Sequence, residues 1–260
     1  MQWSEIIKDY THDLDQIAIN SGTAAKLIHL LDLTSLNDDD TETSIAHFCT
    51  KARTTLGDVA AVCVYPQFVH LVADEFAATP IKVATVVNFP QGIASLESTL
   101  LAIGRALQDG AQEIDVVFPY SKYLNGERAY ASTFVSECKA ACGENVLLKV
   151  ILETGQLKDP VMIAHAATDA LNAGADFLKT STGKTNPGAT LEAATVLLMI
   201  IREMNLPNKG LKISGGVREI QQAGQYVELA ARMMGLEWVT PKHFRIGASQ
   251  LIDNILKEVT

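Results

Sequence analysis

The chain has 260 residues, 48% of them hydrophobic, which is enough to bury a large core within a single domain over residues 1–260. It carries 21 Lys and Arg side chains against 30 Asp and Glu, a formal net charge of -9 at pH 7. Such a charge argues against nonspecific binding of nucleic acid, so an anionic substrate would need a local basic pocket.

The N-terminal segment, residues 1–26, is predicted to form an additional helix within this single domain. It has no basic region followed by an apolar run, so we expect no signal peptide and a cytoplasmic protein. One face of the helix is expected to pack against the underside of the domain, and a dimer contact is the alternative. That face is Trp3, Ile6, Tyr10, Leu14 and Ile17.

Eight segments of strand length follow, rich in β-branched and aliphatic residues, and they start at a mean interval of roughly 31 residues. This interval is the length of one strand-plus-helix unit. The predicted strands are 28–34, 58–66, 81–90, 113–119, 146–154, 176–183, 210–216 and 243–249.

Helical patterns separate these strands. Apolar residues recur at steps of three and four over 93–109 and 161–171, which is typical of amphipathic helices. The longest apolar stretch, 193–201, is far shorter than the roughly 20 residues of a membrane span. We therefore expect a buried helix there and no membrane partner.

Strands that alternate with helices predict an α/β fold with a parallel sheet, and eight such units predict a (β/α)8 TIM barrel over residues 28–258. The alternative is an open doubly wound sheet. That fold usually carries a glycine-rich phosphate turn after its first strand, whereas here the first strand ends Asp32-Leu33-Thr34.

Several of the predicted strands contain ionisable residues among aliphatic ones. In a barrel these side chains would face the interior or the catalytic mouth, and their convergence on one channel indicates an active site. An inert ion-pair network, in which Asp115 neutralises the lysines, is the alternative. The residues are Asp32, Asp115, Lys149, Glu153, Lys179, Lys212 and Arg245.

Lys179 and Lys212 lie on neighbouring predicted strands and can approach each other. Burial of an unpaired ammonium is costly, and repulsion between two lysines lowers the pKa of one of them. A neutral lysine is a nucleophile that attacks carbonyls. The pair therefore indicates amine catalysis.

Small residues follow the same strands, as in Thr180-Ser181-Thr182-Gly183-Lys184, Ser214-Gly215-Gly216 and Gly247-Ala248-Ser249. Loops after the last two strands of such barrels commonly bind phosphate through backbone N–H groups. A plain tight turn is the alternative for the Gly-Gly pair, and a solvated loop charge is the alternative for Lys184.

The four cysteines and six histidines show no C-x-x-C, H-x-H or H-E-x-x-H spacing. Cys138 and Cys142 are four residues apart and would share a helix face. We interpret them as small buried hydrophobes rather than as ligands, because two thiolates do not complete a zinc site. No metal site is expected.

The segment Asp176-Phe177-Leu178-Lys179-Thr180-Ser181-Thr182-Gly183 resembles the Schiff-base strand of the deoxyribose-phosphate aldolase family. The resemblance extends over about residues 28 to 250. Its other segments are Asp32-Leu33-Thr34 with residues 36–41, Val62-Cys63-Val64-Tyr65-Pro66, Val87-Asn88-Phe89-Pro90, Glu113-Ile114-Asp115-Val116-Val117, Lys149-Val150-Ile151-Leu152-Glu153-Thr154 and Lys212-Ile213-Ser214-Gly215-Gly216-Val217.

The resemblance implies a class I aldolase that cleaves 2-deoxy-D-ribose 5-phosphate reversibly to acetaldehyde and D-glyceraldehyde 3-phosphate, without a cofactor and as a homo-oligomer such as a dimer. Lys179 would form the imine, Lys212 would lower its pKa, and Asp115 would share in proton transfer. The implied substrate-binding residues are Asp32 and Thr34 at the sugar hydroxyls, Cys63 in the pocket wall, and Thr182, Gly183, Lys184, Gly215, Gly216 and Ser249 near the phosphate.

The sequence departs from the family pattern in three places. It ends Lys257-Glu258-Val259-Thr260, where some bacterial members have a tyrosine that reaches the active site, so we expect water or Asp115 to serve the enamine. Gln250 follows Ser249 where a second serine is common, and Ile213 precedes Ser214. The alternatives are another lysine-dependent aldolase, a metal-dependent aldolase and a barrel that binds a sugar phosphate without catalysis.

Overall fold

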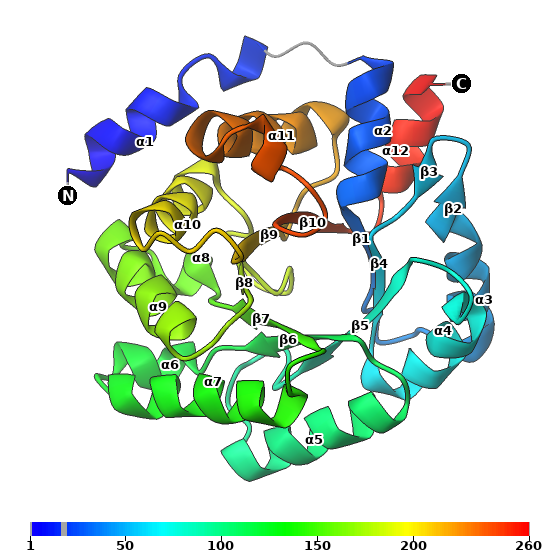
Figure 1. Ribbon diagram of the computed structural model, residues 1–260, viewed down its shortest axis with the longest axis horizontal. Helices are drawn as coiled ribbons and strands as arrows, with labels where there is room; N and C mark the ends of the chain where they lie inside the picture. The colour runs from blue at the N-terminus through cyan, green and yellow to red at the C-terminus, as the bar shows by residue number, and fades with distance from the viewer. Residues whose placement is uncertain (1, 17–19, 260) are drawn as a thin grey trace.

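The computed structural model describes residues 2–16 and 20–259, and eight of its strands form a closed parallel barrel surrounded by helices (Figure 1). The order around the barrel is β1-β10-β9-β8-β7-β6-β5-β4. These strands are β1 Leu31–Ser35, β4 Ala61–Val64, β5 Lys82–Val87, β6 Glu113–Val117, β7 Leu147–Ile151, β8 Phe177–Lys179, β9 Gly210–Ser214 and β10 Phe244–Ala248. The (β/α)8 TIM barrel predicted from the sequence is confirmed.

The helices pack their apolar faces against the outside of the barrel, where most of the core lies. Residues 193–201 are buried throughout within α10, as predicted. The helices are α1 Trp3–Thr11, α2 Ser21–Leu30, α3 Glu42–Cys49, α4 Val69–Phe76, α5 Leu96–Gln108, α6 Tyr120–Leu124, α7 Arg128–Cys142, α8 Thr154–Leu157, α9 Pro160–Asn172, α10 Leu191–Glu203, α11 Ile220–Met234 and α12 Leu251–Val259.

Short elements complete the described chain. Four 3-10 turns are η1 Leu14–Gln16, η2 Thr50–Ala52, η3 Pro66–Phe68 and η4 Leu236–Trp238, and the two-stranded sheet outside the barrel is β2 Arg53–Thr54 with β3 Gly57–Asp58. Within the described ranges, no helix is long and apolar enough to cross a membrane.

The N-terminal segment differs from the single helix predicted over 1–26. It contains α1, the turn η1 and then α2, which begins at an Asn20 cap whose side chain accepts from Thr23 N. α1 contacts α10 and α11 on the outside of the barrel rather than its underside (Figure 1). Ile17, which was assigned to the apolar face, lies outside the described residues.

Two element boundaries also differ from the predicted ones, for local structural reasons. α2 continues to Leu30, so β1 begins three residues later than predicted. α5 begins after Ser95, whose hydroxyl accepts from Ser98 N and caps the helix. Ile93 therefore lies in the preceding loop and is 75% exposed, although its spacing matched the buried face of the helix.

Parallel pairing places the charged residues of neighbouring strands side by side. Asp115 pairs with Lys149, Lys179 pairs with Lys212, and Lys212 pairs with Arg245. Because side chains alternate along a strand, this register directs one charged residue from each of several strands into the same channel.

Candidate active site

Lys179 is the last residue of β8 and its amine is held by a carboxylate from β6. Lys179 Nζ donates to Asp115 Oδ2 at 2.7 Å, and Lys212 Nζ donates to the same oxygen at 2.8 Å. Lys149 Nζ donates to the other oxygen, Oδ1, at 2.9 Å. Asp115 therefore contacts the side-chain nitrogens of three lysines, and the approach of Lys179 to Lys212 predicted from the strand order is confirmed.

The ends of β8 and β9 are tied together beyond the two lysines. Thr180 Oγ1 donates to Ser214 O at 2.9 Å and accepts from Ser214 N at 3.0 Å. Ser214 Oγ donates to Ser181 O at 2.5 Å. These buried bonds fix the turns that follow Lys179 and Lys212, so both amines rest on a rigid support.

The ion pairs continue from Asp115 to the other end of the barrel. Lys212 Nζ lies 2.6 Å from Asp32 Oδ2, and Lys149 Nζ lies 2.6 Å from Glu113 Oε2. Arg245 joins the two branches, with Nη1 2.6 Å from Asp32 Oδ1 and Nη2 3.0 Å from Glu113 Oε1. We call this set the axial network: Asp32, Glu113, Asp115, Lys149, Lys179, Lys212 and Arg245.

Glu113 was not singled out from the sequence as an ionisable residue of the barrel. It stands two residues before Asp115 on β6, so both side chains face inward, and that spacing was the available signal. Arg245 and Lys149, which were expected to be active-site or supporting residues, both contact Glu113.

The axial network contains four basic and three acidic side chains, all buried. If every group were ionised, the network would hold one positive charge more than its own carboxylates balance, which is costly in a low-dielectric interior. A further buried carboxyl, Glu153, lies outside the network and is bound by Thr182. Loss of one proton from one lysine removes the excess. Lys179 is the candidate, because it pairs with one carboxylate whereas Lys212 pairs with two.

The pKa directions agree with this charge balance. Burial is the largest influence on Lys179 and lowers its pKa, Asp115 opposes that effect, and the charge of Lys212 lowers the pKa further. For Lys212, Asp115 and Asp32 outweigh burial and raise the pKa above its usual value. Burial favours protonation of Asp115, but the three lysines hold its pKa well below the usual range. Repulsion between the lysines, the cause expected from the sequence, is therefore secondary to burial.

A pocket of about 340 Å³ opens above Lys179 at the carboxyl ends of the strands. Lys179 is 2% exposed and is the one member of the axial network that lines it. The predicted substrate-binding residues in its wall are Thr34, Thr182, Gly183, Lys184, Gly215, Gly216 and Ser249.

The remaining predicted residues lie below this pocket. Asp32, Asp115, Lys212 and Cys63 are fully buried and do not line it. Asp32 therefore supports the lysines in this structure and is not positioned to touch a ligand in the pocket. Burial raises the pKa of the Cys63 thiol.

The wall also contains residues that the sequence reasoning missed. Arg218 lies in the loop after β9, and Asn37 follows β1. Neither belongs to an apolar strand or to a small-residue turn, so the patterns that identified their neighbours did not include them. Lys184 Nζ donates to Leu36 O at 2.6 Å and so connects the loop after β8 to the loop after β1.

The turn after Lys212 requires glycine. Gly215 has a φ of +96°, and a Cβ there would lie 3.0 Å from Gly188 Cα. A side chain would be strained by the backbone and crowded by its neighbour. Gly215 and the adjacent Gly216 both line the pocket above Lys179.

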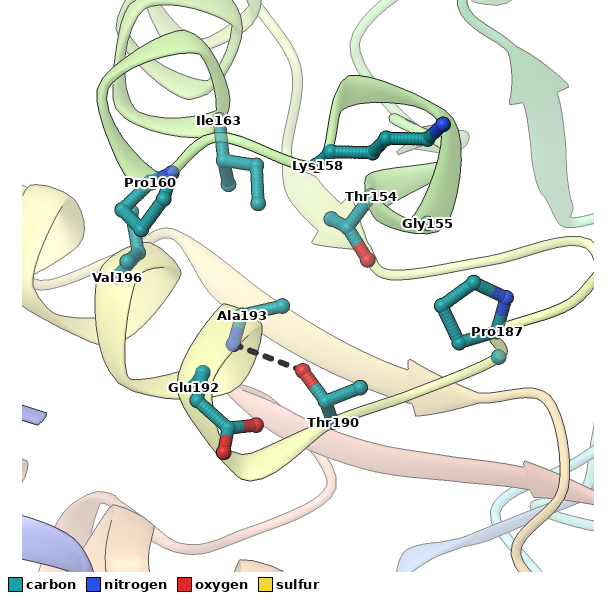
Figure 2. Close-up of a pocket in the computed structure, with 11 residues that line it drawn as sticks. Thr154, Gly155, Lys158, Pro160, Ile163, Pro187, Thr190, Glu192, Ala193 and Val196 are labelled. Atoms are coloured by element: carbon teal, nitrogen blue, oxygen red, sulfur yellow. Dashed lines mark hydrogen bonds between the residues drawn. The ribbon is translucent and has the colours of Figure 1, made fainter.

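A second pocket of about 400 Å³ lies behind this turn, between α8, α9 and the start of α10 (Figure 2). Its lining is mainly apolar and includes Ile163, Ala193 and Val196. Pro187 and Gly188 form its wall on the side of the turn, and a Cβ at Gly188 would lie 2.3 Å from Gly215 O. The loop 186–190 therefore separates the two pockets.

Glu153 lies beside the Lys179 pocket rather than in the axial network. Its Oε2 accepts from Thr182 Oγ1 at 2.5 Å, and Glu153 itself has a left-handed backbone with a φ of +54°. Burial raises the pKa of Glu153, while the bonds from Thr182 oppose that shift. Glu153 thus supports the loop that follows Lys179.

Cys138 and Cys142 occupy the buried positions expected from the sequence. Cys138 and Cys142 are buried on α7, and burial raises the pKa of both thiols. Within residues 2–16 and 20–259, no group of three or more His, Cys, Asp and Glu side chains is arranged to hold a metal ion.

The sequence matches a known protein family over most of its length. The sequence profile of the DeoC/LacD family of aldolases matches residues 26–238. The chain is a DeoC/LacD family aldolase. Aldolases form and break carbon–carbon bonds, so the assignment places this protein among the carbon–carbon lyases.

Solved structures of the family resemble this aldolase over nearly its whole length. A putative deoxyribose-phosphate aldolase from Toxoplasma gondii is 28% identical, with a TM-score of 0.82 over 91% of this chain and 95% of that one. A putative deoxyribose-phosphate aldolase from Coccidioides immitis is 25% identical, with a TM-score of 0.81 over 100% and 97%. The deoxyribose phosphate aldolase of Aeropyrum pernix, described as tetrameric, shares the fold at 24% identity, with a TM-score of 0.76 over 99% and 98%.

Proposed function

We propose that this aldolase is a class I enzyme that cleaves 2-deoxy-D-ribose 5-phosphate to acetaldehyde and D-glyceraldehyde 3-phosphate, and catalyses the reverse addition. The observation that carries the proposal is the position of Lys179. Among the described lysines, it alone belongs to the axial network and also lines the pocket. Similarity to the Toxoplasma gondii and Coccidioides immitis proteins supports the choice of substrate.

The first chemical step joins Lys179 to the substrate. Neutral Lys179 Nζ adds to the aldehyde carbon C1, and loss of water leaves a protonated imine. The proton for the departing hydroxyl comes from the network, in which Asp115 contacts both Lys179 and Lys212. Burial lowers the pKa of Lys179 and so favours the neutral amine before the step, and Asp115 stabilises the cation after it.

The imine then accepts electrons from the bond that breaks. Deprotonation of the C3 hydroxyl sends an electron pair into a carbonyl, the C2–C3 bond breaks, and its electrons form an enamine on Lys179. D-Glyceraldehyde 3-phosphate departs. Protonation of the enamine carbon and hydrolysis of the new imine release acetaldehyde and regenerate Lys179. Lys212 and Asp115, directly or through water, are the proposed proton carriers.

The phosphate end is proposed to lie against the turns after β8, β9 and β10. Gly183, Gly215, Gly216 and Ser249 present backbone to the pocket, while Thr182 supports the first turn through Glu153. Lys184 and Arg218 supply positive charge at the rim. This local charge meets the need for a basic pocket in a chain whose net charge is -9.

The remaining points concern assembly, location, the number of domains and one contact to the sugar. A homo-oligomer is proposed by analogy with the tetrameric Aeropyrum pernix structure. Location in the cytoplasm and a single domain over 1–260 stay predictions from the sequence. Thr34 lines the pocket beside the Lys179 loop and is proposed to contact the sugar hydroxyls.

Trapping of the imine tests the proposal directly. The protein is incubated with acetaldehyde and reduced with borohydride, and we expect an ethyl group on Lys179 by intact-mass and peptide analysis. Cleavage of 2-deoxy-D-ribose 5-phosphate is measured in parallel by detection of acetaldehyde. An adduct on another lysine, or no adduct, would reject Lys179 as the nucleophile. An adduct without cleavage would retain the chemistry and reject the substrate.

The phosphate contacts are tested with Arg218→Gln and Lys184→Gln. A lost hydrogen bond to a charged group costs about 1.5 to 3 kcal/mol, so we expect KM for the phosphorylated sugar to rise roughly 10- to 100-fold with a smaller change in kcat. The matched control is 2-deoxy-D-ribose without phosphate, for which both variants should resemble the wild type. An equal loss on both sugars would contradict the phosphate role.

A further inference from the structure

Glu113 and Arg245 form the end of the axial network that lies farthest from the Lys179 pocket. Neither lines that pocket. Both line a different one, of about 710 Å³, together with Lys82 and Leu147 at the first residues of β5 and β7. Arg245 also donates from Nε to Pro241 O on this side. A ligand above Lys179 therefore does not contact Glu113 or Arg245.

The two ends of the axial network are nevertheless coupled electrostatically, because they share ion-pair partners. Lys149 is shared by Glu113 at 2.6 Å and Asp115 at 2.9 Å. Lys212 is likewise shared by Asp32 at 2.6 Å and Asp115 at 2.8 Å, and Asp32 is also bound by Arg245. A change of charge at the far end alters how strongly these two lysines bind Asp115, and hence how strongly Asp115 binds Lys179.

We propose that Glu113 and Arg245 are positioning residues that set how readily Lys179 gives up its proton, with opposite signs and from the opposite end of the barrel. The proposal rests on the proposed function in one respect, namely that Lys179 is the imine-forming amine. Neither residue takes part in the reaction itself. Both act through Lys149, Lys212 and Asp32 on Asp115.

The sign of each effect follows from the contacts. If Glu113 is neutral, Lys149 keeps Asp115 at 2.9 Å and Asp32 at 3.9 Å and competes more strongly with Lys179 for Asp115. The excess positive charge of the network also grows, so Lys179 loses its proton more easily. If Arg245 is neutral, Asp32 loses that ion pair and binds Lys212 more strongly, which weakens the ion pair between Lys212 and Asp115. Asp115 then depends more on Lys179, which keeps its proton to higher pH.

The other ionisable groups that face Lys179 are the same side chains in both variants. Lys179 is flanked by Asp115 on β6, Lys212 on β9 and Lys149 on β7, with the Cys63 thiol on β4 and the Glu153 carboxyl beyond β7. Each would respond to loss of packing in the same way in either variant. Shifts of opposite sign therefore separate a charge effect from a general loss of structure.

The experiment compares Glu113→Gln with Arg245→Gln in the full chain. The rate of borohydride trapping with acetaldehyde at Lys179 is measured against pH, which gives the midpoint of the amine's titration. For one unit charge at an effective dielectric constant of 20, we expect shifts of about one pH unit, downward for E113Q and upward for R245Q. The charge-conserving variants Glu113→Asp and Arg245→Lys should keep the wild-type midpoint.

The double variant E113Q/R245Q covers the case in which a single variant does not fold, because removal of one partner from a buried pair is strongly destabilising. It removes one charge of each sign, and its midpoint should lie within about half a pH unit of the wild type. Shifts of equal sign in the two single variants, no shift in either, or a larger shift in the double variant would overturn the proposal. Failure of the wild type to trap acetaldehyde at Lys179 would reject the proposed function instead.

Discussion

Replacement of Lys179 by leucine is expected to abolish cleavage of the carbon–carbon bond while the barrel stays folded. No other amine is positioned for the covalent step: Lys149 and Lys212 are fully buried and do not line the pocket, and Lys184 at the rim donates to Leu36 O. We expect kcat to fall by about 10⁴-fold or more. Borohydride trapping should show no ethyl adduct at any pH.

The fold should tolerate this change because of the charge balance. Without Lys179 the axial network holds three basic and three acidic side chains, so the network itself carries no excess charge. Thermal unfolding should therefore change little. The matched control is Lys8→Leu on the exposed face of α1, which should keep full activity.

An inactive and unfolded Lys179→Leu protein would leave activity uninterpretable, and for that reason Lys179→Met and Lys179→Arg should be measured together with it. Methionine keeps the length without the amine, and arginine keeps the charge without a nucleophile at this pH. Retained cleavage in any folded member of this set would contradict the role of Lys179.

Replacement of Lys212 by leucine is expected to slow imine formation near neutral pH far more than at high pH. In the wild-type protein, Lys212 neutralises Asp32 and Asp115, and its charge lowers the pKa of Lys179. Without Lys212, Asp115 depends on Lys179 and Lys149 alone. The pKa of Lys179 then rises, and each unit of that rise removes about tenfold of the neutral amine at pH 7.

The measurement is the pH profile of acetaldehyde trapping at Lys179 and of turnover in the same protein. Above the raised pKa the trapping rate should recover toward the wild-type value, because the amine is again neutral. Turnover should stay lower even there, since Lys212 is also a proposed proton carrier, whose loss typically costs about 10² to 10⁴-fold. An equal loss of trapping at every pH would contradict the role assigned to Lys212 in the titration of Lys179.

The barrel could be predicted from the sequence because its signal is repeated. Eight apolar strands at a regular interval leave few other folds, and the register follows from parallel pairing. The boundaries were less predictable where a cap or a preceding helix decided them, as at Ser95 and Leu30. The N-terminal segment was mispredicted because an apolar stripe does not reveal that η1 interrupts it.

The chemistry of the candidate site was predictable from the sequence, but the roles of individual residues were less so. Inward-facing ionisable residues identified Asp115, Lys179 and Lys212, and the structure brings these together. Nothing in the spacing shows that Asp32 lies beneath the pocket or that Glu113 completes the charge balance. Those facts depend on how far each strand extends along the barrel axis, which the three-dimensional arrangement decides.

The contact between Gly188 and Gly215 limits how this pocket can be reshaped. Backbone meets backbone there, with no side chain that a mutation could shorten, so a larger residue at either position would displace the turn after β9. In directed evolution of the acceptor range, positions 188 and 215 are therefore expected to stay invariant. Thr34, Asn37 and Gln250 line the pocket from other loops. We expect tolerated substitutions to accumulate at these three positions.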